Sequence, residues 1–553
     1  MSFAKKITLG LAALALMAAI VVVALVVLVN PNDYKPFIQQ KAAEQGVELV
    51  IAGDIGWSFF PRPGFSVSNI EARIPVDKAK QSIKLGELSL ALQLSELLHG
   101  RIKVSHLSLR DASTSVGKEA NAMVLLQDIM VDVDNVNVDG SPFPVTMSMQ
   151  VQQPDKPLIN LKLVTTLTLA NVQTAASINM DPLKLTIDDS TFEGQLHYTA
   201  GKPSHTLLKL NSNALNLDRY LLADKSDATA VDTKAATNND SSANAQSVKS
   251  NKQEEPLQFA GLLAFPGEYQ LAVEQLQINH LQLSKAIFSL VIAGEKVTLK
   301  ELSATAYQGA VRLDGVLTAP AHGVPQLSMN TKVTQVQLPT LLNDVQQKPS
   351  SIAAGLLTLD AALTSRPVTK TQALASLSGQ VQLAVDGLVI NDLNIEQRVC
   401  ESAAKVANKP MPDKAWSTTT AFKTLTTTAT IYDGVAQLSP LVGKLDTLDL
   451  TGHGPVNLLD NTLNLELDLA LRNNTAATNF CDVINPRLAD IEWPLRCEGN
   501  YVTQSGKELC RIDKSRLDRV LGQLAEKRIE EKLQEKFGVD ADKIKDGLKK
   551  LFH

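Results

Sequence analysis

Residues 88–94 read Leu-Ser-Leu-Ala-Leu-Gln-Leu, so leucine occupies every second position of this stretch. Successive side chains of a β-strand point to opposite faces of a sheet, and the alternation therefore predicts a strand with one apolar and one polar face. The same alternation recurs at Ile102 and Val104, at Leu183, Leu185 and Ile187, and at Leu463, Leu465, Leu467 and Leu469. Between residues 47 and 471 almost no segment keeps a helical period. We therefore expect a mainly β body.

A sheet with one apolar face must cover that face with helices, a second sheet, its own curvature or a ligand. Helical patterns are too scarce here to provide the cover. A sandwich or barrel with a packed core is one solution, and a long, bent sheet whose inner face holds lipid is another. The residues alone favour the packed core, because most apolar strand faces are core. If the face is open, its wall is predicted at Leu88, Leu90, Leu92, Leu94, Ile102, Val104, Leu183, Leu185 and Ile187.

Residues 7–29 form an uncharged, aliphatic run that is long enough to cross a hydrocarbon layer of about 30 Å as a helix. Lys5 and Lys6 precede it, so the positive-inside rule predicts a cytoplasmic N-terminus and export of everything after the run. The alternative is a cleaved signal peptide, whose apolar core is shorter and ends at small residues. We expect an uncleaved, single-pass anchor.

Composition shifts divide the rest of the chain. Residues 223–256 are rich in Ser, Asn and Asp, a composition that cannot bury enough surface to become ordered. Leu517, Val520, Leu521 and Leu524 follow helical spacing, which predicts an amphipathic helix on the β body or on a membrane. The expected parts are a cytoplasmic end (1–6), the anchor (7–29), a β module that begins with a short helix at 33–45 (30–222), a disordered insertion (223–256), β repeats with the cysteines (257–512) and amphipathic helices (513–553).

A weak internal repeat supports a modular architecture. Residues 192–196 are followed by the leucine-rich segment 215–221, and residues 307–311 are followed in the same way by 336–342. Residues 432–435 resemble the start of a third copy. Repeated β modules that add strands to one sheet give elongated proteins.

Composition excludes several functions. The chain of 553 residues has 53 Lys and Arg against 58 Asp and Glu, and only 4% aromatic residues, so it lacks the basic, stacking surface that binds nucleic acid. No phosphate loop, nucleophile elbow or metalloprotease motif occurs. His99 and His106 are expected to be ordinary surface residues. The acidic segment 132–139 lacks the glutamate of a calcium loop, since Phe143 stands in its place. We expect no catalysis, metal or cofactor.

Four cysteines lie in the last third of the chain, at Cys400, Cys481, Cys497 and Cys510. Export favours disulfides over free thiols, and four cysteines allow three pairings that sequence cannot distinguish. Proximity favours Cys497 with Cys510, which leaves Cys400 with Cys481. A zinc site is the alternative, but no C-x-x-C pair or nearby histidine supports it.

Several segments carry a resemblance to a known family. They are Val-Asn-Pro-Asn-Asp at 29–33, Gly-Asp-Ile-Gly-Trp-Ser-Phe-Phe-Pro at 53–61, the strand pair at 85–109, the segment 377–393 and Ile-Glu-Trp-Pro-Leu-Arg-Cys at 491–497. Together they resemble the AsmA family of inner-membrane-anchored periplasmic proteins of Gram-negative bacteria. The insertion at 223–256 is the chief departure.

The resemblance implies a fold similar to bridge-like lipid transfer proteins, in which a curved, antiparallel sheet forms a groove lined by apolar residues. It implies phospholipid as the ligand, the inner membrane as the location, and a role in outer-membrane lipid homeostasis and assembly. Outer-membrane or other envelope proteins are candidate partners. The alternative is a periplasmic scaffold or chaperone-like factor for outer-membrane protein assembly, with a closed apolar core.

Overall fold

The protein is described by a computed structural model that divides into two compact units, Met1–Ala235 with Phe265–Leu276, and Ala236–Ala264 with Gln277–His553. The described residues are 30–44, 46–58, 63–76, 79–93, 96, 103–116, 124–137, 139–154, 156–170, 176–201, 203–220, 254, 256–471, 481 and 491–537.

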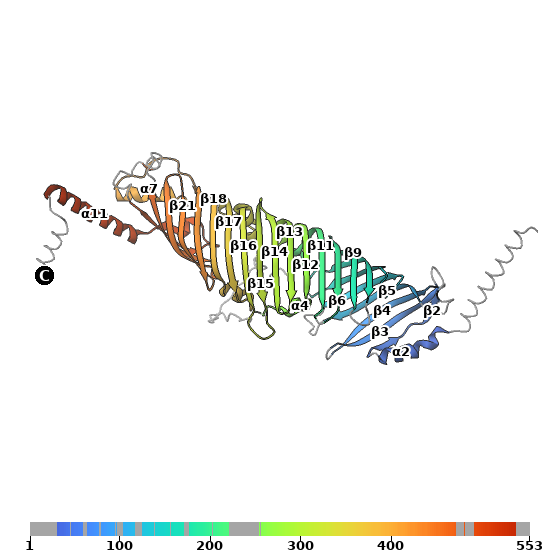
Figure 1. Ribbon diagram of the computed structural model, residues 1–553. Helices are drawn as coiled ribbons and strands as arrows, with labels where there is room; N and C mark the ends of the chain where they lie inside the picture. Colours follow the sequence, from blue (N-terminus) through green and yellow to red (C-terminus); the bar gives the residue numbers. More distant parts are fainter. Residues whose placement is uncertain are drawn as a thin grey trace, which may run out of the picture. The chain divides into compact units, whose positions relative to one another are not determined.

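The first unit begins with two short helices and continues almost entirely as strands (Figure 1). Its helices are η1 (Pro31–Tyr34), α2 (Lys35–Glu44) and η3 (Leu217–Arg219). Its strands are β1 (Glu48–Ile51), β2 (Ile55–Ser58), β3 (Gly64–Val76), β4 (Ala79–Leu92), β5 (Val104–Val116), β6 (Val124–Asp134), β7 (Phe143–Gln152), β8 (Ile159–Ala170), β9 (Ser177–Ile187), β10 (Ser190–Thr199), β11 (His205–Asn216) and β12 (Gly267–Ile278), whose last two residues belong to the second unit.

The second unit has more helices, placed between and after its strands. The helices are α4 (Ala260–Leu263), α5 (Leu338–Gln346), α6 (Lys370–Ala375), α7 (Ile395–Val406), α10 (Gly506–Leu509) and α11 (Lys514–Phe537). The strands are β13 (Leu281–Ala293), β14 (Lys296–Ala306), β15 (Gly309–Thr318), β16 (Gln326–Gln337), β17 (Ile352–Ser365), β18 (Ser378–Asn391), β19 (Thr419–Ala421), β20 (Thr424–Tyr432), β21 (Val435–Lys444), β22 (Leu448–Asn457), β23 (Thr462–Leu471), β24 (Trp493–Asn500) and β25 (Cys510–Ile512).

Each unit is built around one layer of antiparallel strands. In the first unit β1 and β2 both pair with β3, and each strand from β3 to β11 pairs with the next. In the second unit the same order runs from β13 to β25, with β18 paired to both β19 and β20. Among the described strands neither sheet closes on itself. The prediction of a mainly β protein with an open sheet is confirmed.

Bulges bend the first sheet without turning its apolar side chains over. Asp111 and Asp128 have φ values of 51° and 49° and lie at register shifts between β5 and β6 and between β6 and β7. Asn69, with a φ of 52°, lies where β3 and β4 keep their register. Gly86 meets Asp111 there, where a Cβ on residue 86 would lie 2.7 Å from the Asp111 Cβ. A bulge adds one residue to a strand, so apolar residues spaced by three return to the same face.

Some predicted parts lie outside the described residues. These are the anchor at 7–29 and almost all of the insertion at 223–256. Within the described ranges, no helix combines the length and apolar character needed to cross a membrane. The predicted helix at 33–45 corresponds to η1 and α2, and the helix predicted from residue 513 corresponds to α11.

The internal repeat has a structural counterpart in two strand pairs that each end in a helical turn. In the first pair, β10 and β11 lead into η3. The hydroxyl of Tyr220, directly after η3, donates at 2.8 Å to Oδ2 of Asp188, which lies in the turn before β10. In the second, β15 and β16 lead into α5, and the Tyr307 hydroxyl in the turn before β15 donates to Asp344 Oδ2 at 2.6 Å in that helix. The same tyrosine tie, a hydrogen bond from a Tyr hydroxyl to an Asp carboxylate, is therefore made twice, and the Tyr and the Asp exchange places between the two copies.

Both disulfides lie in the second unit, and the pairing is the one that proximity favoured. Cys400 in α7 is bonded to Cys481, and Cys497 in β24 is bonded to Cys510 in β25. The first joins residues 81 apart in sequence, whereas the second joins residues 13 apart and facing one another across two paired strands.

We expect the two disulfides to contribute unequally to stability. Closing loops of 81 and 13 residues removes chain entropy worth about 4.5 and about 3 kcal/mol at 25 °C. Replacing Cys400 and Cys481 with Ala should therefore lower the free energy of unfolding of the second unit by more than the matched replacement of Cys497 and Cys510. Urea unfolding of the two double variants checks this order, and an equal or reversed order contradicts it.

The two tyrosine ties predict loss of stability at alkaline pH. Burial, with the hydrogen bond to a carboxylate, raises the pKa of Tyr220 and of Tyr307 from 10.0 to about 12. Their stabilising contribution is complete below pH 10 and is lost as pH rises towards 12. Tyr220→Phe with Tyr307→Phe should flatten that decline in unfolding free energy. Tyr432→Phe, whose side chain is 72% exposed, should leave it in place, and an unchanged decline in the double variant would contradict the assignment.

Candidate functional site: an apolar sheet face

One row of side chains crosses ten strands of the first unit on the same face of the sheet. Residues paired across antiparallel strands point to the same side, so the pairings define the row strand by strand. This first-unit apolar row consists of Ile55, Val67, Leu88, Leu109, Val131, Met147, Leu163, Leu185, Phe192 and Ser212. At about 4.8 Å between strands, the row is about 40 Å long.

The neighbouring row, which points to the opposite side, has the reverse character. This first-unit polar row consists of Ser66, Ser89, Ser108, Asp132, Thr146, Val164, Lys184, Glu193 and Asn211. Lys184 and Glu193 form an ion pair of 2.7 Å, and Ser108 donates to Asp132 at 2.7 Å. The sheet therefore has one solvated face and one apolar face.

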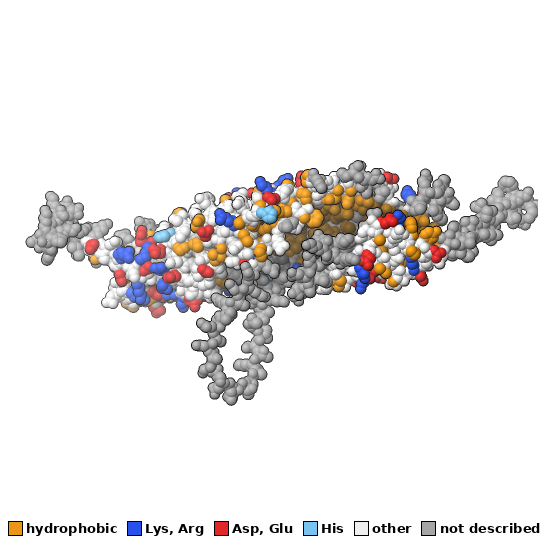
Figure 2. All heavy atoms as spheres, turned by 90° about the horizontal axis from the view of Figure 1, so that it is seen from below, with side chains coloured by type: hydrophobic (Ala, Val, Ile, Leu, Met, Phe, Trp, Pro, Cys, Tyr) orange, Lys and Arg blue, Asp and Glu red, His pale blue; other side chains and the backbone are white. Residues whose placement is uncertain are grey.

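Among the residues that the structure describes, no helix packs over the middle of the first-unit apolar row. Every member from Val67 to Leu185 is half-buried, whereas Ile55 and Phe192 near the ends of the row are 6% exposed. Figure 2 shows hydrophobic side chains gathered in a hollow on one face of the molecule. An apolar surface of this extent is unusual on a soluble protein and marks a binding surface.

Four of the predicted wall residues lie on this face. Leu88 and Leu185 belong to the apolar row, and Leu90 and Leu183 lie in a parallel row that also contains Leu107 and Val133.

The other described wall residues lie at strand ends. Leu92, the last residue of β4, pairs with Val104, the first residue of β5. Ile187, the last residue of β9, pairs with Leu161 on β8. Leu94 and Ile102 lie outside the described residues. The middle of the apolar row was not selected from sequence, although Val131, Met147 and Leu163 lie in alternating stretches that could have identified them.

The corresponding row of the second unit changes from open to sealed along its length. This second-unit apolar row consists of Val333, Leu359, Leu383, Thr427, Leu441, Gly452, Leu467, Leu495 and Ile512. Val333, Leu359 and Leu383 are half-buried, but Leu441, Leu467 and Leu495 are 8%, 5% and 1% exposed. The change occurs where β20 joins the sheet.

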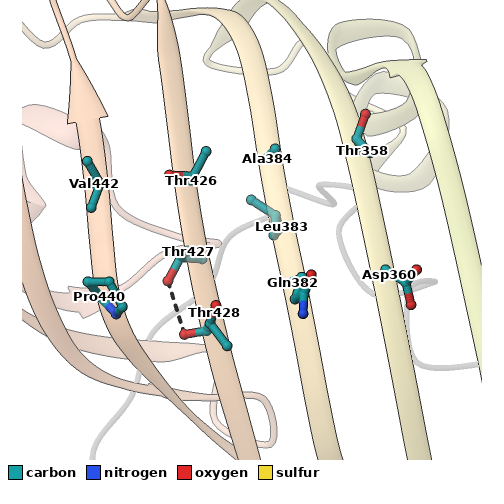
Figure 3. Close-up of a pocket in the computed structure, with 10 residues that line it drawn as sticks. All are labelled: Thr358, Asp360, Gln382, Leu383, Ala384, Thr426, Thr427, Thr428, Pro440 and Val442. Carbon is teal, nitrogen blue, oxygen red and sulfur yellow. Dashed lines mark hydrogen bonds between the residues drawn. The ribbon is translucent and has the colours of Figure 1, made fainter.

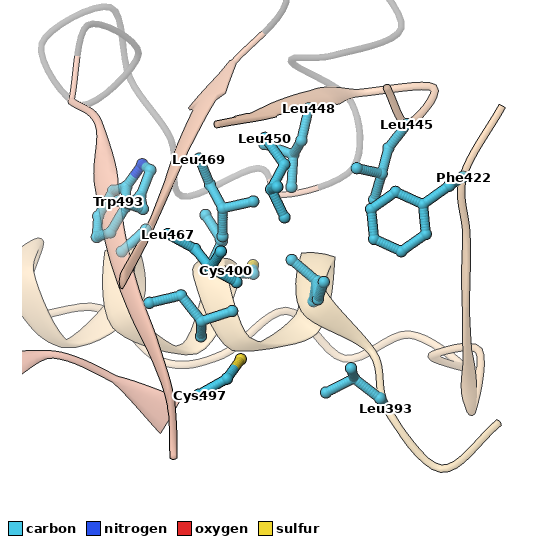
Figure 4. Close-up of a cluster of buried hydrophobic side chains, with 14 of the residues drawn as sticks. Leu393, Cys400, Phe422, Leu445, Leu448, Leu450, Leu467, Leu469, Trp493 and Cys497 are labelled. Carbon is cyan, nitrogen blue, oxygen red and sulfur yellow. The ribbon is translucent and has the colours of Figure 1, made fainter. Parts of the chain in front are cut away.

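Helix α7 provides the seal. Its buried side chains are Ile395, Val399, Cys400, Ala403 and Ala404, and they belong to the same hydrophobic cluster as the buried leucines of β22 and β23. Figure 4 shows α7 lying against the strands that carry Leu450, Leu469 and Trp493. The open-face interpretation is therefore wrong for β21 to β24, where the apolar side chains form a packed core.

Sequence analysis missed α7, although two signals were present. Asn394 caps the helix, with its side chain accepting from the Gln397 amide at 2.8 Å. The buried positions 395, 399, 400, 403 and 404 also follow helical spacing. Together these signals indicate an amphipathic helix whose apolar side faces the core.

The polar face carries depressions that are lined mainly by polar side chains. One has a volume of about 350 Å³ and crosses β17, β18, β20 and β21. Figure 3 shows its lining of Thr358, Asp360, Gln382, Thr426 and Thr428, with no histidine or cysteine among the labelled residues. Among the residues that the structure describes, no group of three or more His, Cys, Asp or Glu is placed to hold a metal ion.

Of the acidic segment that was compared with a calcium loop, Asp132 and Asp134 lie in β6, and Asp139 lies between β6 and β7. Asp132 accepts from Ser108, and Asp134 lies 3.0 Å from the Nδ1 atom of His106 on the neighbouring strand. These side chains tie strands together on the solvated face. His99 lies outside the described residues, so its predicted surface position stays a prediction.

Comparison with known proteins identifies the family. The chain matches the AsmA family over residues 1–165 and 159–441. It is 20% identical over 559 aligned residues to Protein AsmA of Escherichia coli (strain K12), an alignment that covers 86% of this chain and 89% of that protein. No solved structure matches the chain. Since the family match covers most of the sequence, this chain belongs to the AsmA family.

Proposed function

We propose that this protein carries phospholipids along the open apolar face of its sheet, with the bulk of the chain in the periplasm. In this proposal residues 7–29 anchor it in the inner membrane, and the transported lipid supports outer-membrane homeostasis and assembly. The observation that carries the proposal is the first-unit apolar row, which is half-buried from Val67 to Leu185 and faces away from the polar row. No chemical step or cofactor is assigned to the protein.

The dimensions of the face suit acyl chains. One leaflet of a bilayer has a hydrocarbon thickness of about 15 Å, so a row of about 40 Å is longer than a single acyl chain. Each buried methylene contributes roughly 0.8 kcal/mol, and this stabilisation does not depend on where along the row the chain lies. A lipid could therefore shift along the face without losing its binding energy, while its headgroup stays in water.

The packed core under α7 limits where lipid can bind. Leu467, Leu469 and Leu495 already contact protein side chains on the apolar face, so acyl chains have no access to them. The proposed lipid surface in the second unit therefore ends near β18 and β20, and lipid must leave the face before it reaches the core.

The alternative function, a scaffold for outer-membrane protein assembly with a closed apolar core, is favoured by this sealed region. It requires the first-unit face to be occupied by protein as well, and it predicts no phospholipid in the purified protein. Lipid crosslinking on the two faces of one strand distinguishes the two functions.

We expect a photoreactive p-benzoylphenylalanine at Leu185 to crosslink phospholipid in cells, since this position faces the apolar row. The matched control is the same probe at Lys184, the adjacent residue, which points to the opposite face. A third probe at Leu469, which is 0% exposed, should give no lipid adduct. Mass spectrometry of the adducts is the measurement. Equal lipid labelling at 184 and 185, or none at 185, contradicts the proposal.

Alanine substitution provides an independent test of whether the first-unit face is open. In the delipidated protein Leu469→Ala should cost about 2 to 5 kcal/mol of unfolding free energy, because it leaves a cavity in a packed core. Leu185→Ala should cost about 1 kcal/mol, because less apolar area is buried there. Native-state hydrogen exchange of β9 and β23 measures both. A cost at Leu185 equal to that at Leu469 would show that the first-unit face is packed core.

A further inference from the structure

The end of η1 and the start of α2 present large apolar side chains to solvent near the start of the described chain. Tyr34, Phe37 and Ile38 are 55%, 58% and 39% exposed. Positions 34, 37, 38 and 41 lie on one side of a helix, so Lys41 extends the same stripe, with its Nζ 6.0 Å from the centre of the Phe37 ring. No residue of α2 is buried. Three exposed large apolar side chains within residues 34–38, one in η1 and two in α2, indicate a partner surface.

We infer that this stripe binds the headgroup layer of the bilayer that holds the predicted anchor, so that α2 lies along the membrane surface. The inference goes beyond the proposed function and rests on its membrane-anchored placement. The anchor is predicted to end at residue 29, and η1 begins at Pro31. Five residues at a rise of about 2 Å keep Tyr34 within at most about 10 Å of the hydrocarbon. Each headgroup layer is about 5 to 8 Å thick, so the stripe is within reach of this layer.

The chemistry of the stripe suits this layer better than it suits a protein partner. Aromatic side chains with a polar end, such as Tyr34, are enriched at membrane–water interfaces. Lys41, whose side chain is 57% exposed, can reach anionic headgroups while its methylenes follow the apolar surface. Phe37 and Ile38 supply the apolar area that an interfacial helix inserts.

The helix is held in a fixed orientation towards the first strands of the apolar face. The Asn32 side chain accepts from the Ile55 amide at 2.9 Å and donates to the Ile55 carbonyl at 3.2 Å. Ile55 is the first member of the first-unit apolar row. Lys35 adds an ion pair of 3.2 Å to Asp54. A helix that lies on the bilayer would therefore hold the start of the row beside the leaflet from which lipid enters.

The test is tryptophan fluorescence of the full-length chain reconstituted in vesicles of phosphatidylethanolamine and phosphatidylglycerol, with part of the lipid brominated on its acyl chains. Phe37→Trp should give an added, blue-shifted emission that brominated lipid quenches. Ala43→Trp, at an exposed position on the other side of the helix, should give emission that is not quenched. The unmodified chain provides the signal of Trp57, Trp416 and Trp493 for subtraction.

Each outcome decides the inference. Quenching of Phe37→Trp but not of Ala43→Trp supports it. A blue shift without quenching identifies a protein on the stripe and overturns it, as does unshifted emission in a chain that still floats with the vesicles. In both cases the membrane anchor and lipid crosslinking at Leu185 remain compatible with the result. The proposed lipid transport is therefore not overturned together with this inference. If the chain does not float, the anchored placement fails as well. Tyr34→Trp repeats the measurement if Phe37→Trp does not fold.

Discussion

The structure depends on a cross-strand register that keeps apolar side chains on one side of the sheet across strand after strand. A one-residue slip in any strand would move its apolar residues to the solvated face and its charged residues to the apolar face. The polar face helps to hold this register, since Lys184 pairs with Glu193 and Ser108 with Asp132 on neighbouring strands. Hydrogen-bonded partners on one side thus maintain a continuous apolar surface on the other.

The apolar face of the sheet is covered to different extents in the two units. In the first unit it stays half-buried, and no helix packs on its middle strands among the described residues. In the second unit α7 covers it, and the disulfide between Cys400 and Cys481 holds that helix. One alternating pattern therefore provides a half-buried apolar face in one place and a packed core in another. The difference lies in the segment that connects β18 to β19, and the strands themselves do not reveal it.

Sequence reasoning was accurate where the physics is local. The alternation at 183–187 and at 463–469 predicted strands, and those strands are β9 and β23. It was less accurate where a distant segment decides the outcome. Leu467 and Leu185 have the same local pattern, but only Leu467 has a helix above it, and that helix begins about seventy residues earlier in the chain. The bulges were also missed, because a spacing of three, as from Leu109 to Ala112, interrupts strict alternation.

The antiparallel order of the strands constrains how such a protein can vary in length during evolution. Adding a single strand would leave the chain at the opposite end of the strands, where the turns or helices that follow could no longer reach their positions. Adding a hairpin returns the chain to the same end of the strands and continues the same apolar rows. We therefore expect relatives of different length to differ by whole hairpins, so that the length of the apolar face changes in steps of two strands, or about 10 Å.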